Sequence, residues 1–289
     1  MTKTILGFIG GSGIYDLPQI THKQWVKINS PWGEASDELL IAEYNGMKLV
    51  FLPRHGRGHK ISPTDINYRA NIDVLKRAGV TDLISLSAVG SLKEEYAPGD
   101  FVIIDQFIDR TVNRHKSFFG SGCVAHVSLA YPISPNLQQR VYDAAQTLEI
   151  KTHLNGTYLA MEGPQFSSLA ESNMYRAWGC DVIGMTNQPE AKLAREAEIC
   201  YAAVSMVTDY DCWHPEHGEV DIPKIMAVLK QNNENASKLV LKLLESFPKQ
   251  HEACSIGSDR ALEFAIMTAP EARDPELIAK LDAVAGRVL

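Results

Sequence analysis

Cysteine is scarce in this chain, and the five residues present are scattered: Cys123, Cys180, Cys200, Cys212 and Cys254. Their number is odd, and no two of them form a C-x-x-C pair. This excludes a zinc ribbon and a thiol–disulfide exchange motif. The pattern predicts free thiols in a reducing compartment, and we therefore expect a cytoplasmic protein.

Long apolar runs are also lacking, because no stretch approaches the length of about 20 residues that a membrane span needs. The apolar segment near the N-terminus is short and runs directly into the glycines Gly10–Gly13, unlike a signal peptide. Acidic residues outnumber basic ones, 35 to 28, for a net charge of −7. No chain-wide basic field exists, so we expect neither a nucleic-acid nor a membrane partner.

Internal repeats, low-complexity tracts and long Gly/Ser linkers are missing as well. Their absence favours one domain over residues 1–289. The segment Pro248–Ser258 is the one joint that we expect, and it precedes a helical tail at about residues 255–289.

What the chain does have is a regular alternation of apolar strands and helices. Expected strands are residues 5–9, 82–87, 100–104, 183–185 and 200–207, with a hairpin at 39–43 and 48–52 around Asn45-Gly46. Expected helices are residues 64–76, 135–148, 168–178, 189–196 and 222–244, with two more in the tail. The alternation predicts an α/β fold, a single domain in which helices flank a mixed, mostly parallel sheet.

Two carboxylates, Asp209 and Asp211, follow the strand expected at residues 200–207. On an extended backbone, residues two apart point to the same face. The C-terminal edge of a parallel sheet is where α/β proteins bind ligands. A donor and an acceptor at that edge can read N7 and the 6-amino group of adenine. For an isolated Asp-x-Asp, a solvated turn, a helix N-cap or a metal site is the alternative.

Three further segments follow expected strands and suit an anion. Gly10–Gly13 offers backbone amides and the Ser12 hydroxyl, Arg54–His59 offers a guanidinium and a histidine that can donate a hydrogen bond, and Ser85–Ser91 offers hydroxyls in a small-residue turn. Taken singly, each is equally explained as a tight turn or a basic surface loop. Asp16 stands where a dinucleotide-binding loop has its third glycine, which disfavours a pyrophosphate.

A last group of residues suits a nucleoside. Glu162, before Gly163-Pro164, can present its carboxylate to a sugar hydroxyl. Phe166 can stack on a base, and Met185 can pack beneath a ribose. Ordinary core positions explain a phenylalanine and a methionine equally well.

The order of these segments resembles the trimeric purine nucleoside phosphorylase family, in particular its members that cleave 5′-methylthioadenosine. The resemblance runs from about Ile5 to about Leu244. Its anchors are Gly7–Gly13, Arg54–His59, Asn67–Ile72, Ser87–Ser91, Pro98–Asp100, Ile103–Thr111, Met161–Ser168, Ala170–Ser172 and Val207–Trp213. The resemblance implies the nucleoside phosphorylase fold and a homotrimer, with a hexamer as the alternative, whose sites lie near the subunit interfaces.

The resemblance also implies roles for individual residues. Phosphate would be held by Ser12, Arg54, His55, Ser87, Ala88 and Thr186. The purine and ribose would be contacted by Asp209, Asp211, Phe166, Ser167 and Met185. The 5′-methylthio group would be lined by Ile222 and Ile225, with His126 reaching into the site of a neighbouring subunit.

The implied reaction is phosphorolysis of S-methyl-5′-thioadenosine to adenine and 5-methylthioribose 1-phosphate, with phosphate as co-substrate and no metal or organic cofactor. Asp209 is the expected proton donor to N7, since burial and a second carboxylate raise a pKa. Asp211 is the expected acceptor from the 6-amino group, which makes a 6-oxopurine nucleoside the weaker alternative. The sequence is also compatible with a broader 6-aminopurine nucleoside phosphorylase, with a nucleosidase and with a non-catalytic nucleoside sensor.

The chain departs from the family pattern at three residues and in its tail. Ser12 and Ser87 stand where relatives often have threonine, and Gln165 stands where they commonly have arginine. The tail after Glu252 differs too, so the choice among methylthioadenosine, adenosine and 5′-deoxyadenosine stays open.

Overall fold

The computed structural model describes residues 2–11, 17–215 and 222–289. Within these residues eleven strands form a single sheet. The strands are β1 (Ile5–Gly10), β2 (Thr21–Val26), β3 (Leu39–Tyr44), β4 (Met47–Pro53), β5 (Asp82–Ser91), β6 (Phe101–Ile103), β7 (Gln106–Asp109), β8 (Thr152–Leu154), β9 (Thr157–Ala160), β10 (Val182–Gly184) and β11 (Cys200–Asp209).

The sheet runs in the order β2-β3-β4-β1-β5-β10-β9-β7, and β11 joins it by pairing with β5 and β6. Six of the ten strand pairings in the described chain are parallel, including β1 with β4 and β5 with β11. The predicted hairpin around Asn45-Gly46 is the antiparallel pair β3–β4. The predicted α/β class with a mixed, mostly parallel sheet is therefore confirmed.

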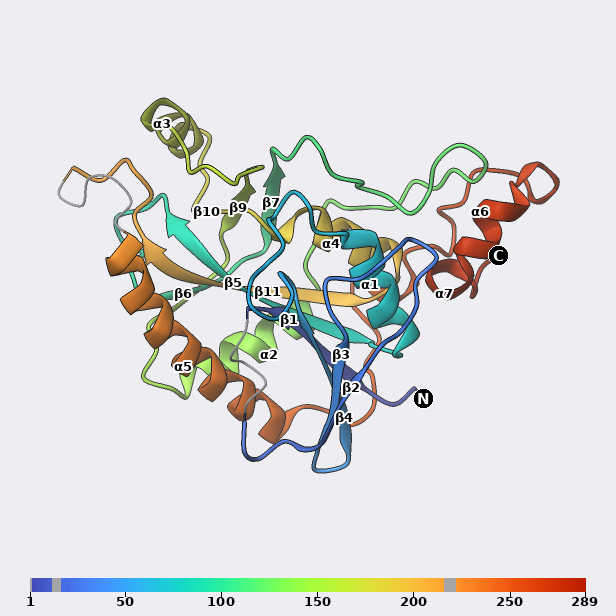
Figure 1. The fold of residues 1–289 in the computed structure, drawn as a ribbon, viewed down its shortest axis with the longest axis horizontal. Coiled ribbons are helices and arrows are strands. Elements are labelled where there is room, and N and C mark those ends of the chain that lie inside the picture. Colours follow the sequence, from blue (N-terminus) through green and yellow to red (C-terminus); the bar gives the residue numbers. More distant parts are fainter. Residues whose placement is uncertain (1, 12–16, 216–221) are drawn as a thin grey trace.

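Helices cover both faces of this sheet (Figure 1). α2 (Pro135–Gln146) and α5 (Ile222–Ser246) pack together on one face, and α1 (Tyr68–Arg77) and α4 (Asn187–Glu196) pack together on the other. α3 (Leu169–Ala177) lies at one edge, while α6 (Pro275–Lys280) and α7 (Asp282–Ala285) lie at the opposite side. No described helix is both long and apolar enough to cross a membrane.

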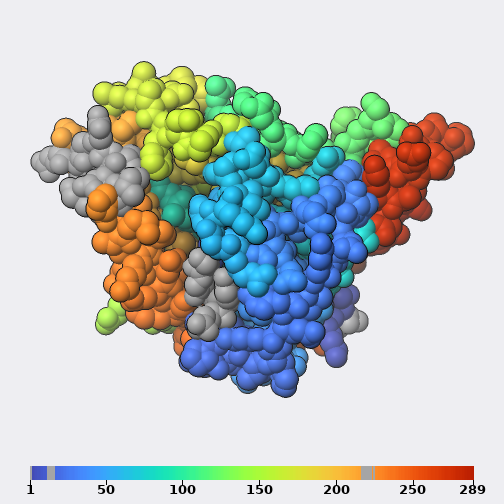
Figure 2. Space-filling view, in the orientation of Figure 1, coloured from blue at the N-terminus to red at the C-terminus, as the bar shows by residue number. Residues whose placement is uncertain are grey.

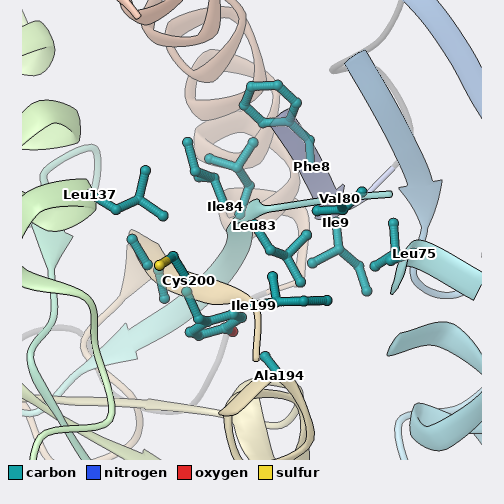
Figure 3. Packing of buried hydrophobic residues seen from close by; sticks show 14 of the residues in the cluster. Phe8, Ile9, Leu75, Val80, Leu83, Ile84, Leu137, Ala194, Ile199 and Cys200 are labelled. Carbon is teal, nitrogen blue, oxygen red and sulfur yellow. The ribbon is translucent and has the colours of Figure 1, made fainter. Parts of the chain in front are cut away.

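Apolar side chains from the strands and from the helices on both faces meet in one main core (Figure 3). Leu83 and Ile84 of β5 lie at its centre, and Leu137 and Ala194 contribute from α2 and α4. Each buried side chain of the size of leucine or isoleucine stabilises the fold by about 1.5–3 kcal/mol. This packing makes the sheet a rigid support for the loops at its edge.

Two helices begin at residues other than those predicted, and local chemistry explains both. α1 begins at Tyr68 rather than Thr64, because the Asn67 side chain accepts a hydrogen bond from Ala70 N (3.1 Å) and caps the helix there. α4 begins at Asn187, two residues before the predicted Pro189, but Gln188 is extended (φ −123°, ψ 133°), as expected before a proline, so the continuous helix begins at Pro189 as predicted.

Strands β5 and β11 both extend beyond their predicted ends. The segment Ser87–Ser91, expected as a turn, continues β5, because it pairs with β11 on one side and with β10 on the other. β11 reaches Asp209 through a bulge at Thr208, where Val207 pairs with Val89 and Asp209 with Gly90. Long-range pairing has overridden the local turn signal.

The C-terminal tail packs against the segment that carries His126. His126 N donates to Ala265 O (2.9 Å), Met267 N to Val124 O (2.8 Å) and Asp274 N to Gly122 O (2.8 Å). In Figure 2 the tail, in red, and this segment, in green, form a projection at one side of the molecule. Phe264, at 91% exposed, lies on this projection.

A buried carboxylate, Glu196, joins α4 to the chain at residues 117–118. It accepts hydrogen bonds from Ser117 Oγ and Phe118 N, both at 2.7 Å. Burial raises the pKa of Glu196 to about 7, although these two bonds favour the charged form. The folded protein therefore holds this proton more tightly than the unfolded chain does.

The pKa shift of Glu196 predicts a dependence of stability on pH. Its contribution is most favourable below the unfolded pKa of about 4.5 and is lost as the pH rises through about 7, at a cost of about 3 kcal/mol. We expect Glu196→Gln to be more stable relative to the parent at pH 8 than at pH 5, measured by urea unfolding. An equal difference at both pH values would contradict the assigned pKa.

Candidate active site

A cleft of about 360 Å³ opens where β1, β4, β5, β10 and β11 end. Its lining includes predicted site residues from six separate parts of the chain: Arg54, His55, Ser87, Ala88, Phe166, Met185, Thr186, Asp209, Asp211 and Ile225. These residues span 172 positions of the sequence, so only the fold brings them together. Ser12 lies outside the described residues, as does the side chain of Ile222.

The aspartate pair is assembled by a turn rather than by an extended strand. β11 ends at Asp209, and Asp211 has a left-handed backbone (φ 51°). Asp211 N donates to Asp209 Oδ1 (2.8 Å), which closes the turn and keeps both carboxyl groups at the cleft. Gly90 of β5 makes room for them, since a Cβ there would lie 3.0 Å from Asp209 Oδ1. The expectation that the pair shares one face of a strand is therefore corrected.

Burial raises the pKa of both aspartates. The charge of Asp209 raises the pKa of Asp211 further. Asp211 Oδ2 is buried and has no hydrogen-bond partner within the described residues. An unpaired buried oxygen is costly, and a ligand with a donor would relieve that cost.

The hydroxyl of Thr208 links Asp209 to the neighbouring strand. Thr208 Oγ1 lies 3.1 Å from Val89 O and 2.7 Å from Asp209 Oδ2. A hydroxyl has a single proton, and a carbonyl oxygen can only accept. In the shorter of the two contacts the hydroxyl donates to the Asp209 carboxylate, and this hydrogen bond lowers the pKa of Asp209 against the effect of burial.

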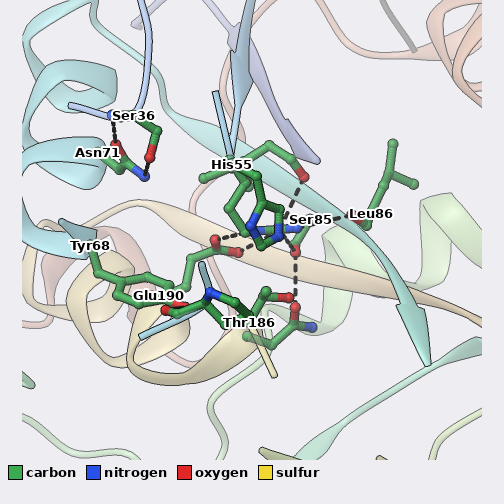
Figure 4. A network of polar contacts seen from close by, with 12 residues as sticks. Ser36, His55, Tyr68, Asn71, Ser85, Leu86, Thr186 and Glu190 are labelled. Carbon is green, nitrogen blue, oxygen red and sulfur yellow. Dashed lines mark hydrogen bonds and ion pairs between the residues drawn. The ribbon is translucent and has the colours of Figure 1, made fainter. Parts of the chain in front are cut away.

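Elsewhere in the cleft, the guanidinium of Arg54 is bound by protein groups, among them Glu190, Ser85 and Leu86 (Figure 4). Its Nε and Nη2 fork onto Glu190 Oε2 and Oε1 (2.8 and 3.1 Å), and Nη1 donates to Leu86 O (3.1 Å). Arg54 is 2% exposed and Glu190 fully buried. The second N–H of Nη1 has no acceptor within the described residues and remains available to an anion. Phosphate binding by Arg54 stays a prediction, carried by one N–H rather than by the fork.

Two other groups that can bind an anion, Ser87 and His55, line the same region of the cleft. Ser87 Oγ is buried and without a hydrogen-bond partner in the described part of the chain. His55 Nδ1 lies 2.9 Å from Ile61 O, and its ring stacks on that of His59 at 4.2 Å. Ser87 and Gly90 lie three residues apart on β5, roughly 10 Å. That spacing separates the candidate anion site from the aspartates by about the length of a nucleoside.

Arg114, which no sequence pattern indicated, stabilises the side of the cleft where we expect the sugar and the base to bind. Arg114 is buried and donates to Met185 O, to Gln188 O (2.7 Å) and to Glu162 O (2.7 Å). Glu162 in turn accepts from Thr64 Oγ1 (2.7 Å) and Arg114 Nε (3.2 Å). Its carboxylate therefore positions the 112–114 segment, and the interpretation that it faces a sugar hydroxyl is wrong.

The remaining predicted residues lie in different places. Phe166 is 51% exposed at the cleft, so it is not an ordinary core residue. Ser167 is absent from the described lining, although its carbonyl accepts a hydrogen bond from Cys212 Sγ (3.4 Å). His126 is exposed on the projection beside the tail, outside the cleft of its own chain.

Two cleft residues on α5 escaped the sequence interpretation. Leu229 and Asn233 follow Ile225 at intervals of four residues, which places the three on one face of the helix. Their helical spacing from Ile225 is the sequence pattern that would have predicted them as site residues. His59 also lines the cleft, and it belongs to the Arg54–His59 segment already noted.

Comparison with known families agrees with this geometry. Residues 5–245, more than four fifths of the chain, match the model of the phosphorylase superfamily. The chain belongs to the phosphorylase superfamily. A solved structure from an antarctic soil metagenome, a methylthioadenosine phosphorylase, shares the α/β sheet described above and superposes with a TM-score of 0.91. It is 43% identical, and the match covers 98% of this chain and 99% of that one.

Similarity to individual superfamily members extends through the tail. A protein of Bradyrhizobium diazoefficiens named S-methyl-5′-thioadenosine phosphorylase is 62% identical over 289 residues, covering 100% of this chain and 99% of its own. A variant of the Schistosoma mansoni adenosine/methylthioadenosine phosphorylase, solved with methylthioadenosine, is 33% identical with a TM-score of 0.78. That match covers 84% of this chain and 91% of the other. The tail beyond residue 245 is therefore shared with a bacterial relative although it lies outside the superfamily model.

Proposed function

We propose that this protein catalyses the phosphorolysis of S-methyl-5′-thioadenosine, which yields adenine and 5-methylthioribose 1-phosphate. One observation carries the proposal: a single cleft holds two buried polar atoms without protein partners in the described chain, Asp211 Oδ2 and Ser87 Oγ. The first suits the 6-amino group of a purine, and the second suits a phosphate oxygen. The names of the relatives, which share up to 62% identity, support the same reaction.

In the proposed reaction the bond from C1′ to N9 breaks, and a bond from C1′ to a phosphate oxygen forms. The transition state resembles an oxocarbenium ion, so the enzyme gains rate by stabilising charge on the departing base. Asp209, whose pKa burial raises, donates a proton to N7. Adenine thus gains one proton while hydrogen phosphate releases one, and the overall reaction is balanced without a metal or an organic cofactor.

The burial of Asp209 supports its assignment as the acid. Burial raises the pKa of Asp209 although Thr208 Oγ1 and Asp211 N donate hydrogen bonds that favour the charged form. Asp211 remains the acceptor for the 6-amino group. A 6-oxopurine would place a carbonyl oxygen against Asp211 Oδ2, which leaves both acceptors unpaired. We therefore rank a 6-oxopurine nucleoside phosphorylase below a 6-aminopurine one.

The test is release of free base from methylthioadenosine, adenosine, 5′-deoxyadenosine and inosine, each with and without phosphate. We expect adenine from methylthioadenosine only when phosphate is present, and little hypoxanthine from inosine. Release without phosphate would indicate a nucleosidase, and binding without release would indicate a nucleoside sensor. The ranking of the three adenine nucleosides reports on the pocket formed by Ile225 and its neighbours on α5.

We also propose a homotrimer, with a hexamer as the alternative, in which the projection around His126 reaches a neighbouring subunit. His126 is exposed and held in place by the tail, which supports a role outside its own chain. All five cysteines are free thiols, which supports a location in the cytoplasm.

A further inference from the structure

His55 has a defined protonation pattern in this structure. Its Nδ1 lies 2.9 Å from Ile61 O. A backbone carbonyl can only accept, so Nδ1 must carry the proton of this hydrogen bond. The other ring nitrogen, Nε2, has no hydrogen-bond partner within the described residues, and the side chain lines the cleft.

The surroundings of His55 keep the ring neutral. The ring is largely buried and stacks on His59 at 4.2 Å, with an angle of 20° between the ring planes. Burial lowers the pKa of His55 to about 4, although the hydrogen bond to Ile61 O favours the charged ring. A neutral ring with its proton on Nδ1 exposes a lone pair on Nε2, and so offers the cleft an acceptor rather than a donor.

We propose that His55 Nε2 accepts a hydrogen bond from the P–OH group of hydrogen phosphate, and that the site thereby selects phosphate over anions without a proton, such as sulfate. The inference rests on the proposed function for the identity of the co-substrate. It reverses the expectation from the sequence, in which the histidine donates. Proton transfer is not required, because the hydrogen bond itself distinguishes the anions.

The charges around His55 leave the choice between anions to individual hydrogen bonds such as this one. The guanidinium of Arg54 is neutralised by Glu190, so its charge gives the region little general attraction for anions. Binding then depends on individual hydrogen bonds, such as those from Ser87 Oγ and the free N–H of Arg54 Nη1. Sulfate would place an acceptor oxygen against the Nε2 lone pair, and two facing acceptors cost at least about 1.4 kcal/mol, or tenfold in affinity.

The experiment measures inhibition of methylthioadenosine phosphorolysis by sulfate and by monofluorophosphate, neither of which carries a P–OH or S–OH proton at pH 8. We expect both anions to bind the parent enzyme at least tenfold more weakly than phosphate. His55→Gln places an amide, which can donate, near the position of Nε2. In His55→Gln and in His55→Ala, the difference in affinity between phosphate and each of the other two anions should narrow to within about threefold.

Ser87→Ala is the matched control, because a hydroxyl donor serves every anion alike. It should weaken phosphate and sulfate together and leave their ratio unchanged. Sulfate binding as tight as phosphate in the parent, or an unchanged ratio in both His55 variants, would overturn the proposal. Calorimetric titration of the two anions needs no turnover, so it tests this inference even if adenine release fails and the proposed function falls.

Discussion

Asp209→Asn should lower the rate of adenine release from methylthioadenosine by roughly 10²–10⁴-fold, the usual contribution of a general acid. The amide keeps the shape and the bond from Asp211 N, but it cannot transfer a proton to N7. The variant should fold, since Asp209 lies at the end of β11 and forms no ion pair within the described chain. Steady-state assay of free adenine at saturating phosphate measures the effect.

The leaving group distinguishes proton donation from simple binding. A methylthioribosyl substrate that releases 4-nitrophenolate needs no proton, so Asp209→Asn should slow it far less than it slows the adenine substrate. Because burial raises the pKa of Asp209, the activity of the parent should fall as the pH rises through that pKa. In Asp209→Asn this fall in activity with pH should be absent. Asp143→Asn, at an exposed position of α2, is the matched control. Equal loss for both substrates would leave Asp209 as a binding group only.

Glu190→Ala should lower the free energy of unfolding by roughly 3–5 kcal/mol, because it leaves the Arg54 guanidinium buried without its counter-charge. Glu190 also accepts from Tyr201 Oη (2.8 Å), and that bond is lost as well. Urea unfolding or thermal unfolding of the apo-protein measures the change. This is the largest stability effect that we expect from a single substitution in the polar network around Arg54.

The double variant Arg54→Met with Glu190→Leu separates the cost of an unpaired charge from the value of the pair. Replacing both partners by apolar residues of similar size is often neutral or stabilising, so its stability should lie within about 2 kcal/mol of the parent. Similar destabilisation in the single and double variants would show that the pair itself, rather than the orphaned charge, holds this region together.

Much of the site was predictable because its residues lie in short segments that follow strands. Asp209, Ser87 and Arg54 each stand at or near the end of an apolar run, and parallel strands bring such ends to one edge of a sheet. Their shared cleft follows from that rule. Leu229 and Asn233 were predictable in principle as well, by their helical spacing from Ile225.

The parts that could not be predicted depend on contacts between distant residues. Arg54 and Glu190 are 136 positions apart, and Arg114 lies 48 positions from Glu162, so no local pattern pairs them. Pairing with β10 and β11 converted the Ser87–Ser91 turn into strand. In each case the free energy of burying a charge or completing a sheet outweighed the local preference.

The sequence by itself determined the α/β class, the order of the strand-end segments and the residue types that a purine and an anion require, because these depend on local periodicity and side-chain chemistry. Only the tertiary structure decided how those residues are used. In the folded chain the guanidinium of Arg54 pairs with Glu190, the carboxylate of Glu162 pairs with Arg114, and the His55 proton lies on Nδ1. Burial is the physical reason, since a polar group removed from water must take the partner that the fold places beside it.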